Sequence, residues 1–156
     1  MATRNILNGS EDILRKKSRE VAVFDKRLHQ LLEDMAETMA EANGLGLAAP
    51  QVGVLRRVFI AQNGDKNVEF INPNIVWRSD ETVTEHEGCL SFPGEYGYVE
   101  RPQSVTVQAQ DRRGNFFEMT GEGILARAIC HEIDHLDGVL FVDLTEEVLS
   151  FEEDDE

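Results

Sequence analysis

The chain has 156 residues, a length typical of one domain with a substantial hydrophobic core. Its 30 acidic and 15 basic side chains give a formal net charge of −15, which argues against stable nucleic-acid binding, because phosphate backbones are also negative. It contains no apolar run of about 18 residues, no N-terminal targeting composition and too few cysteines for a disulfide framework. We therefore expect no membrane span and a cytoplasmic location.

The first predicted element is a helix that starts after Asp25, whose side chain suits an N-cap. Apolar residues then keep helical spacing as far as Gly44: Leu28, Leu31, Leu32, Met35 and Met39. The next segment, 44–51, is rich in small residues and ends in Gln51, whose amide can both donate and accept hydrogen bonds. It predicts either a helix C-cap followed by a tight turn or a close approach of the backbone to another group.

Short β-branched and aromatic runs predict strands at 57–61, 69–71, 75–77, 104–109 and 116–119, with a hairpin connection at 111–114. A final helix is expected over 121–137, ended by Gly138. Strands followed by a helix that packs on them predict an α+β fold, with mostly antiparallel β-sheets packed around a central helix. We expect one domain over residues 1–147 and an acidic tail over 148–156.

The final helix contains His131-Glu132-Ile133-Asp134-His135, an H-E-x-x-H sequence. Histidines four positions apart share a helix face and lie about 6 Å apart along the axis, so they can bind one metal ion. Glu132 can then reach a water on that ion, which is an arrangement suited to hydrolysis. The alternative is a chance match in a helix rich in Glu and His.

A catalytic metal usually has three protein ligands and one open position, so a third ligand is needed. The candidates are Cys89, Cys130, His29, His86, Asp143, Glu146 and Glu147. Cys130 lies about 100° from His131 around the helix and faces elsewhere, and His29 falls in a different, surface-like helix. Cys89 follows an extended run and a glycine, which suits a thiolate ligand. From the residues alone, a buried structural cysteine is the favoured alternative.

Three segments in this order, GLGLAAPQ (44–51), EGCLS (87–91) and HEIDH (131–135), resemble the signature motifs of the peptide deformylase family. The resemblance covers essentially the whole chain. It implies a hydrolase that removes the N-formyl group from N-formylmethionine at the start of nascent polypeptides and releases formate. It also implies that Cys89, His131 and His135 bind one divalent metal, natively Fe²⁺ in many members, for which Zn²⁺, Ni²⁺ or Co²⁺ can substitute.

The same resemblance implies roles for four further residues. Glu132 is the general acid/base, Gln51 and the backbone N–H of Leu90 stabilise the oxyanion, and Gly46 lies along the substrate. Each role has a physical reason, since a formamide is a poor electrophile and neutral water a poor nucleophile. Donors already aimed at the developing oxyanion can contribute about 3–4 kcal/mol each.

Two further sets of residues are candidates near this site. Ala128 and Ile124 share the helix face of His131, so with Leu45 they could line a pocket for an unbranched apolar side chain; alternatively, both pack in the core. The family pattern also pairs Glu87 with Arg101, a bond that would hold the Cys89 loop in place. Arg101 could equally be a solvated surface charge.

The acidic composition of the C-terminal residues bears on whether the protein binds the ribosome. Residues 146–156 carry seven acidic side chains and no basic one, whereas some deformylases have a basic C-terminal helix that binds ribosomal RNA. We therefore expect a monomer that meets the ribosome only briefly, with formylmethionyl nascent chains as its partners. Two other classes remain open: a zinc endopeptidase that uses the same helix with a downstream carboxylate ligand, and a metal-free binding or structural protein.

Overall fold

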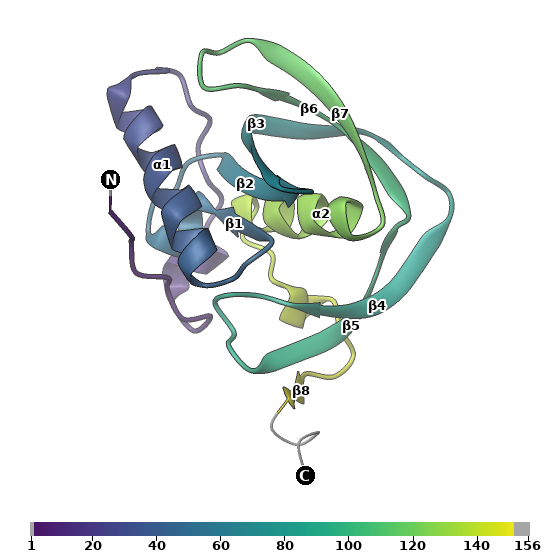
Figure 1. Ribbon diagram of the computed structural model, residues 1–156. Coiled ribbons are helices and arrows are strands. Elements are labelled where there is room, and N and C mark those ends of the chain that lie inside the picture. The colour runs from purple at the N-terminus through teal and green to yellow at the C-terminus, as the bar shows by residue number, and fades with distance from the viewer. Residues whose placement is uncertain (1, 152–156) are drawn as a thin grey trace.

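A computed structural model describes residues 2–151 and shows an α+β fold, in which strands surround one central helix (Figure 1). The two α-helices of this part are α1 (Lys26–Glu41) and the central α2 (Ile124–Leu136). The strands are β1 (Gly46–Ala48), β2 (Val58–Asn63), β3 (Lys66–Arg78), β4 (Thr82–Gly88), β5 (Glu95–Pro102), β6 (Ser104–Gln110), β7 (Phe116–Glu122) and β8 (Leu149–Ser150). Three short 3-10 helices span Asp12–Arg15, Ala49–Val52 and Phe141–Asp143.

Two sheets lie on either side of α2 (Figure 1). The larger has five strands in the order β1-β2-β3-β6-β7, and the smaller has three in the order β4-β5-β8. Every pairing between neighbouring strands is antiparallel, so the predicted fold class is confirmed. No helix within residues 2–151 combines the length and the apolar character needed to cross a membrane.

The helix α1 forms as its sequence predicts. The Asp25 carboxylate accepts a hydrogen bond from the Leu28 N–H at 3.1 Å, which caps the first turn. The apolar stripe is buried and packs against Leu47 and Ile60 of β1 and β2. The helix α1 therefore packs against β1 and β2 of the larger sheet. Segment 44–51 follows the end of this helix.

The helix α2 packs its apolar face against the larger sheet, where Ile129 lies in a cluster with Phe59 and Val107. The same helix buries His131, Glu132 and His135, which are at most 7% exposed. Burying ionisable groups costs free energy unless bonding compensates for it. Three such residues on one buried helix mark this part of the fold as a functional site rather than a packing surface.

Several predicted boundaries were wrong. The runs at 69–71 and 75–77 belong to one strand, β3, which is interrupted at Asn72 with φ of 52°. The Asn72 side chain bonds the N–H and C=O of Val21 at 2.8 and 2.9 Å, and this holds the irregular backbone. The predicted helix 121–137 is shorter, because residues 121 and 122 extend β7 and Gly123 adopts a φ of 59° at the N-cap.

The C-terminal part of the described chain is folded further than expected. Leu149 and Ser150 form β8, which pairs with β5, and the Phe151 N–H donates to the Gly94 carbonyl at 2.9 Å. The Phe151 ring stacks on Tyr96 with centroids 4.4 Å apart. Folded structure therefore continues beyond residue 147, where the acidic tail was predicted to begin. Residues 152–156 of that predicted tail lie outside the described residues.

Candidate metal centre and active site

The structure brings Cys89, His131 and His135 together. Their ligand atoms all lie within 4.8 Å of one another, and the Cys89 Sγ is 3.3 Å from the His135 Nε2. Cys89 follows the last residue of β4, while both histidines project from α2. Within residues 2–151 this is the only group of three or more such side chains that could hold a metal.

The three side chains fit a divalent metal. Bonds of about 2.3 Å to sulfur and about 2.0 Å to nitrogen in a tetrahedral site put neighbouring ligand atoms about 3.5 Å apart, close to the observed 3.3 Å. Burial lowers the pKa of His135 well below its usual value, which keeps the ring neutral as a ligand requires. The Nδ1 of His131 is bonded to Glu87 at 2.7 Å, so its Nε2 is left for the ion.

The other predicted candidates for the third ligand have different surroundings. Cys130 is buried in the core cluster, and burial raises the pKa of its thiol. His29 bonds the Arg112 carbonyl at 2.9 Å. The carboxylate of Asp143 accepts from the Leu140 N–H and from Arg15. His86, Glu146 and Glu147 do not belong to the metal-binding group found in residues 2–151, so a downstream carboxylate ligand gains no support.

Glu132 lies in the wall of the cavity beside this centre. Its side chain is buried, and burial raises the pKa of the carboxyl group to about 7. A carboxyl group that titrates near neutrality can both accept and return a proton at physiological pH. Its Oε1 has no hydrogen-bond partner within the described residues, which leaves this oxygen available for water or substrate.

Gly46 explains why segment 44–51 is so rich in small residues. A Cβ atom at Gly46 would lie 2.6 Å from the Glu132 Oε2, and one at Gly44 would lie 2.6 Å from the Cδ1 of Leu90. The close backbone approach predicted for this segment is therefore present, and it is made to the side chains of the site itself. Gly46 begins strand β1, so this segment does not form only a turn.

The amide of Gln51 is fixed in one orientation. Its Oε1 accepts from the Ala48 N–H at 3.0 Å, and its Nε2 donates to the Ser91 Oγ at 3.1 Å and lies 3.4 Å from the Cys89 Sγ. The side chain is 1% exposed, so this arrangement is rigid. The NH₂ group of Gln51 therefore points to the Cys89 side of the metal centre.

Glu87 connects the centre to the smaller sheet. It receives two hydrogen bonds from Arg101, at 3.0 and 2.7 Å, so the predicted pair is present and buried. Burial alone would raise the pKa of Glu87, but the bonds from His131 and Arg101 outweigh it and lower the pKa to about 2. The resulting anion fixes the tilt of the His131 ring.

Two members of this network were missed by the sequence analysis. Arg127 donates to Glu87 at 3.0 Å and to the carbonyls of Val83 and Val99 at 2.8 Å each. Asp134 accepts from Arg101 at 2.7 Å. Helix periodicity could have indicated both residues. Arg127 lies four positions before His131 and Asp134 three after it, so both share its helix face.

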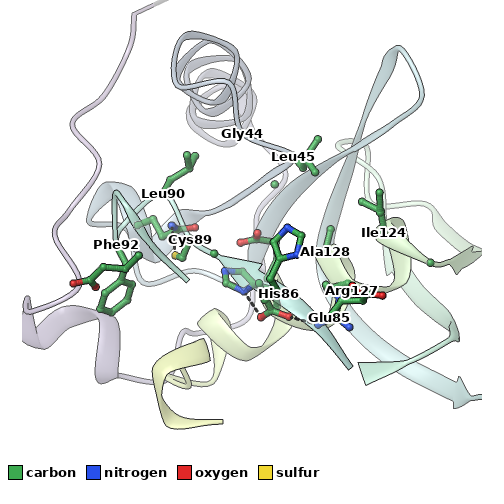
Figure 2. Close-up of a pocket in the computed structure, with 18 of the residues that line it drawn as sticks. Gly44, Leu45, Glu85, His86, Cys89, Leu90, Phe92, Ile124, Arg127 and Ala128 are labelled. Atoms are coloured by element: carbon green, nitrogen blue, oxygen red, sulfur yellow. Dashed lines mark hydrogen bonds and ion pairs between the residues drawn. The ribbon is translucent and has the colours of Figure 1, made fainter. Parts of the chain in front are cut away.

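A cavity of about 780 Å³ opens above the centre. Figure 2 shows Cys89 and Leu90 on one side of it and Ala128 and Ile124 of α2 on the other. Ala128 is half-buried in the wall, whereas Ile124 and Leu45 are 72% and 52% exposed and lie at the rim. The alternative that Ile124 packs in the core is therefore excluded. Gly46, Gln51, His131 and Glu132 also line the cavity.

Comparisons with known proteins agree with this geometry. The family model described as polypeptide deformylase matches residues 3–149. A peptide deformylase of Caldicellulosiruptor bescii is 56% identical, over 98% of this chain and 92% of that one. The crystal structure of peptide deformylase from Thermotoga maritima superposes with a TM-score of 0.90 at 41% identity, over 93% of this chain and 99% of that one.

A third match is informative about ligands. A Met-Ala-Ser-bound crystal structure of a class I type b peptide deformylase from Acinetobacter baumannii has a TM-score of 0.86 at 36% identity, and covers 91% of this chain and 98% of that one. Family model, relatives and solved structures thus all span the described fold and its Cys/His/His centre. The chain belongs to the peptide deformylase family.

Proposed function

We propose that this protein removes the N-formyl group from N-formylmethionyl peptides and releases formate. The observation that carries the proposal is the convergence of Cys89, His131 and His135 beside Glu132, at the base of an open cavity. Fe²⁺ is the proposed native metal, and Zn²⁺, Ni²⁺ or Co²⁺ would fit the same mixed sulfur and nitrogen ligands. The thiolate of Cys89 would temper the Lewis acidity of the ion.

Each side chain of the site has a part in the reaction. The bound metal supplies Lewis acidity and brings the pKa of water at the site toward neutrality. Glu132, which is buried and has a raised pKa, takes a proton from the attacking water and passes it to the departing amine. The NH₂ group of Gln51 and the backbone N–H of Leu90 donate to the oxygen on which negative charge develops.

The cavity wall supports an unbranched apolar side chain at the substrate N-terminus. Ala128 leaves room in the wall, while Leu45 and Ile124 provide apolar surface at the rim. Methionine fits such a pocket because its thioether chain is flexible and unbranched. The tripeptide Met-Ala-Ser bound in the Acinetobacter baumannii relative has the sequence of a deformylated product, which agrees with this assignment.

The direct test is an assay with formyl-Met-Ala-Ser. We expect formate release by protein that was purified anaerobically with Fe²⁺, and loss of activity after a chelator has removed the metal. Parallel preparations with Zn²⁺, Ni²⁺ and Co²⁺ would rank the metals by kcat/KM. The proposal would be wrong if no metal form releases formate while the protein remains folded.

Replacing Ala128 with phenylalanine tests the pocket. The ring would fill part of the cavity wall, so we expect KM for formyl-Met-Ala-Ser to rise at least about tenfold, the equivalent of about 1.4 kcal/mol of lost binding. Metal content should not change, because Ala128 is not among the ligand group. Steady-state kinetics and metal analysis of the same preparation measure both quantities. An unchanged KM would remove Ala128 from the pocket.

We further propose that the protein works as a monomer in the cytoplasm, where its encounters with the ribosome are brief. The net charge of −15 supports this, since a strongly acidic surface is repelled by ribosomal RNA. Pelleting with ribosomes at several salt concentrations is a suitable measurement. Tight association that does not weaken as salt rises would contradict the proposal.

A further inference from the structure

The N-terminal residues 7–9 connect two segments of the active site: the 3-10 turn at 49–52, which holds Gln51, and the connection at 89–92, which holds Cys89 and Leu90. We call these the two active-site loops. Residues 7–9 lie outside any helix or strand, and we call them the strap. At one end the Leu7 N–H donates to the Gln51 carbonyl at 2.7 Å. At the other end the Gly9 N–H donates to the Ser91 carbonyl, also at 2.7 Å. The strap therefore bonds the main chains of both loops.

Gly9 leaves no space between the strap and the second loop. It is buried, and a Cβ atom at this position would lie 2.1 Å from the tip of the Phe92 ring. Phe92 is itself packed edge-on against Phe141, with centroids 5.4 Å apart. Figure 2 shows Phe92 next to the pale purple N-terminal chain, on the same side of the cavity as Leu90 and Cys89. A larger residue at position 9 must displace either the ring or the strap.

The two bonded loops carry the groups for which position matters most. The first holds Gln51 and the second holds Cys89 and Leu90. The Gln51 Nε2 bonds across to the Ser91 Oγ at 3.1 Å and to the Cys89 Sγ at 3.4 Å. The strap reinforces these bonds through the main chains of both loops. Preorganised donors lose most of their effect when they are displaced by about 1 Å.

We propose that the strap sets the separation of the two loops and that Gly9 is a positioning residue for the reaction. This inference rests on the proposed deformylase function. The strap residues are neither among those that line the cavity nor in the metal-ligand group within residues 2–151, so we expect the strap to act on kcat, through the alignment of Gln51 and Leu90. Loss of the strap bonds should leave His131 and His135 of α2 in place.

The test is Gly9→Ala, measured in the wild-type chain and in a Phe92→Leu background. In the wild-type chain we expect kcat for formyl-Met-Ala-Ser to fall at least about tenfold, with KM and metal content within about threefold. In the Phe92→Leu background the same substitution should cost less than about threefold, because the shorter side chain leaves room for the methyl group. Equal losses in both backgrounds would overturn the steric argument.

A second variant removes a strap bond without adding volume at Gly9. Leu7→Pro eliminates the N–H that donates to Gln51, and Asn5→Pro is its matched control, since the Asn5 N–H has no partner within the described residues. We expect a drop in kcat for the first variant only. A loss that merely follows the folded fraction in circular dichroism, or equal rates for both, would overturn the proposal. Wild-type protein that releases no formate would overturn both this proposal and the deformylase function.

Discussion

Glu132→Gln is expected to lower kcat for formyl-Met-Ala-Ser by about 10² to 10⁴ and to leave KM and metal content nearly unchanged. The amide has the shape of the carboxyl group but cannot take up the water proton. Glu132 is buried and does not belong to the ligand group, so its replacement should not release the metal. Single-turnover kinetics on protein of measured metal content provide the test.

The matched control for this variant is Glu118→Gln. It makes the same chemical change on the exposed face of β7, outside the cavity, and should leave kcat unaltered. A tenfold or smaller effect of Glu132→Gln would show that another group moves the proton. Loss of the metal would show instead that Glu132 contributes to the stability of the centre.

Cys89→Ala should abolish both metal retention and activity. With only two histidines left, the ion should be lost during dialysis under conditions in which the wild-type chain keeps about one equivalent. Activity on formyl-Met-Ala-Ser should then fall at least about 10³-fold, since both the attacking water and the oxyanion lose their stabilisation. Thermal melting gives an independent measurement, because metal binding to the folded state should raise the Tm of the wild-type chain alone.

The other cysteine offers a control within the same chain. Cys130 lies one residue from His131 but faces the core, so Cys130→Ala should keep the metal and most of the activity. A Cys89→Ala variant that retains one equivalent of metal would favour a different third ligand. That outcome would reopen the endopeptidase alternative, in which a downstream carboxylate binds the ion.

The helices could be predicted because their signals are local. Asp25 caps α1, and the apolar stripe behind it keeps one period over the whole helix. Strand β5 escaped prediction because its buried face consists of Gly97, Val99 and Arg101, which do not read as alternating apolar residues. Arginine on a buried face makes sense only once Glu87 is known to lie on the neighbouring strand.

Only part of the site could be predicted from the spacing of residues. The spacing of His131 and His135 identified two ligands, since it depends on one helix alone. The choice of Cys89 as the third depended on the resemblance to a family, because no spacing rule places a distant loop beside a helix. Arg127 shares the helix face of His131, but its partners could not be predicted for the same reason: its three side-chain hydrogen bonds go to Glu87, Val83 and Val99, which are far away in the sequence.

The position of Phe151 has a practical consequence for handling the protein. The residue lines the cavity, and its ring stacks on Tyr96. A chain shortened before Phe151 would therefore lose part of the cavity wall. Kinetic constants from such a truncation would describe an altered cavity, so Phe151 has to be retained in any protein whose activity is compared with that of the relatives.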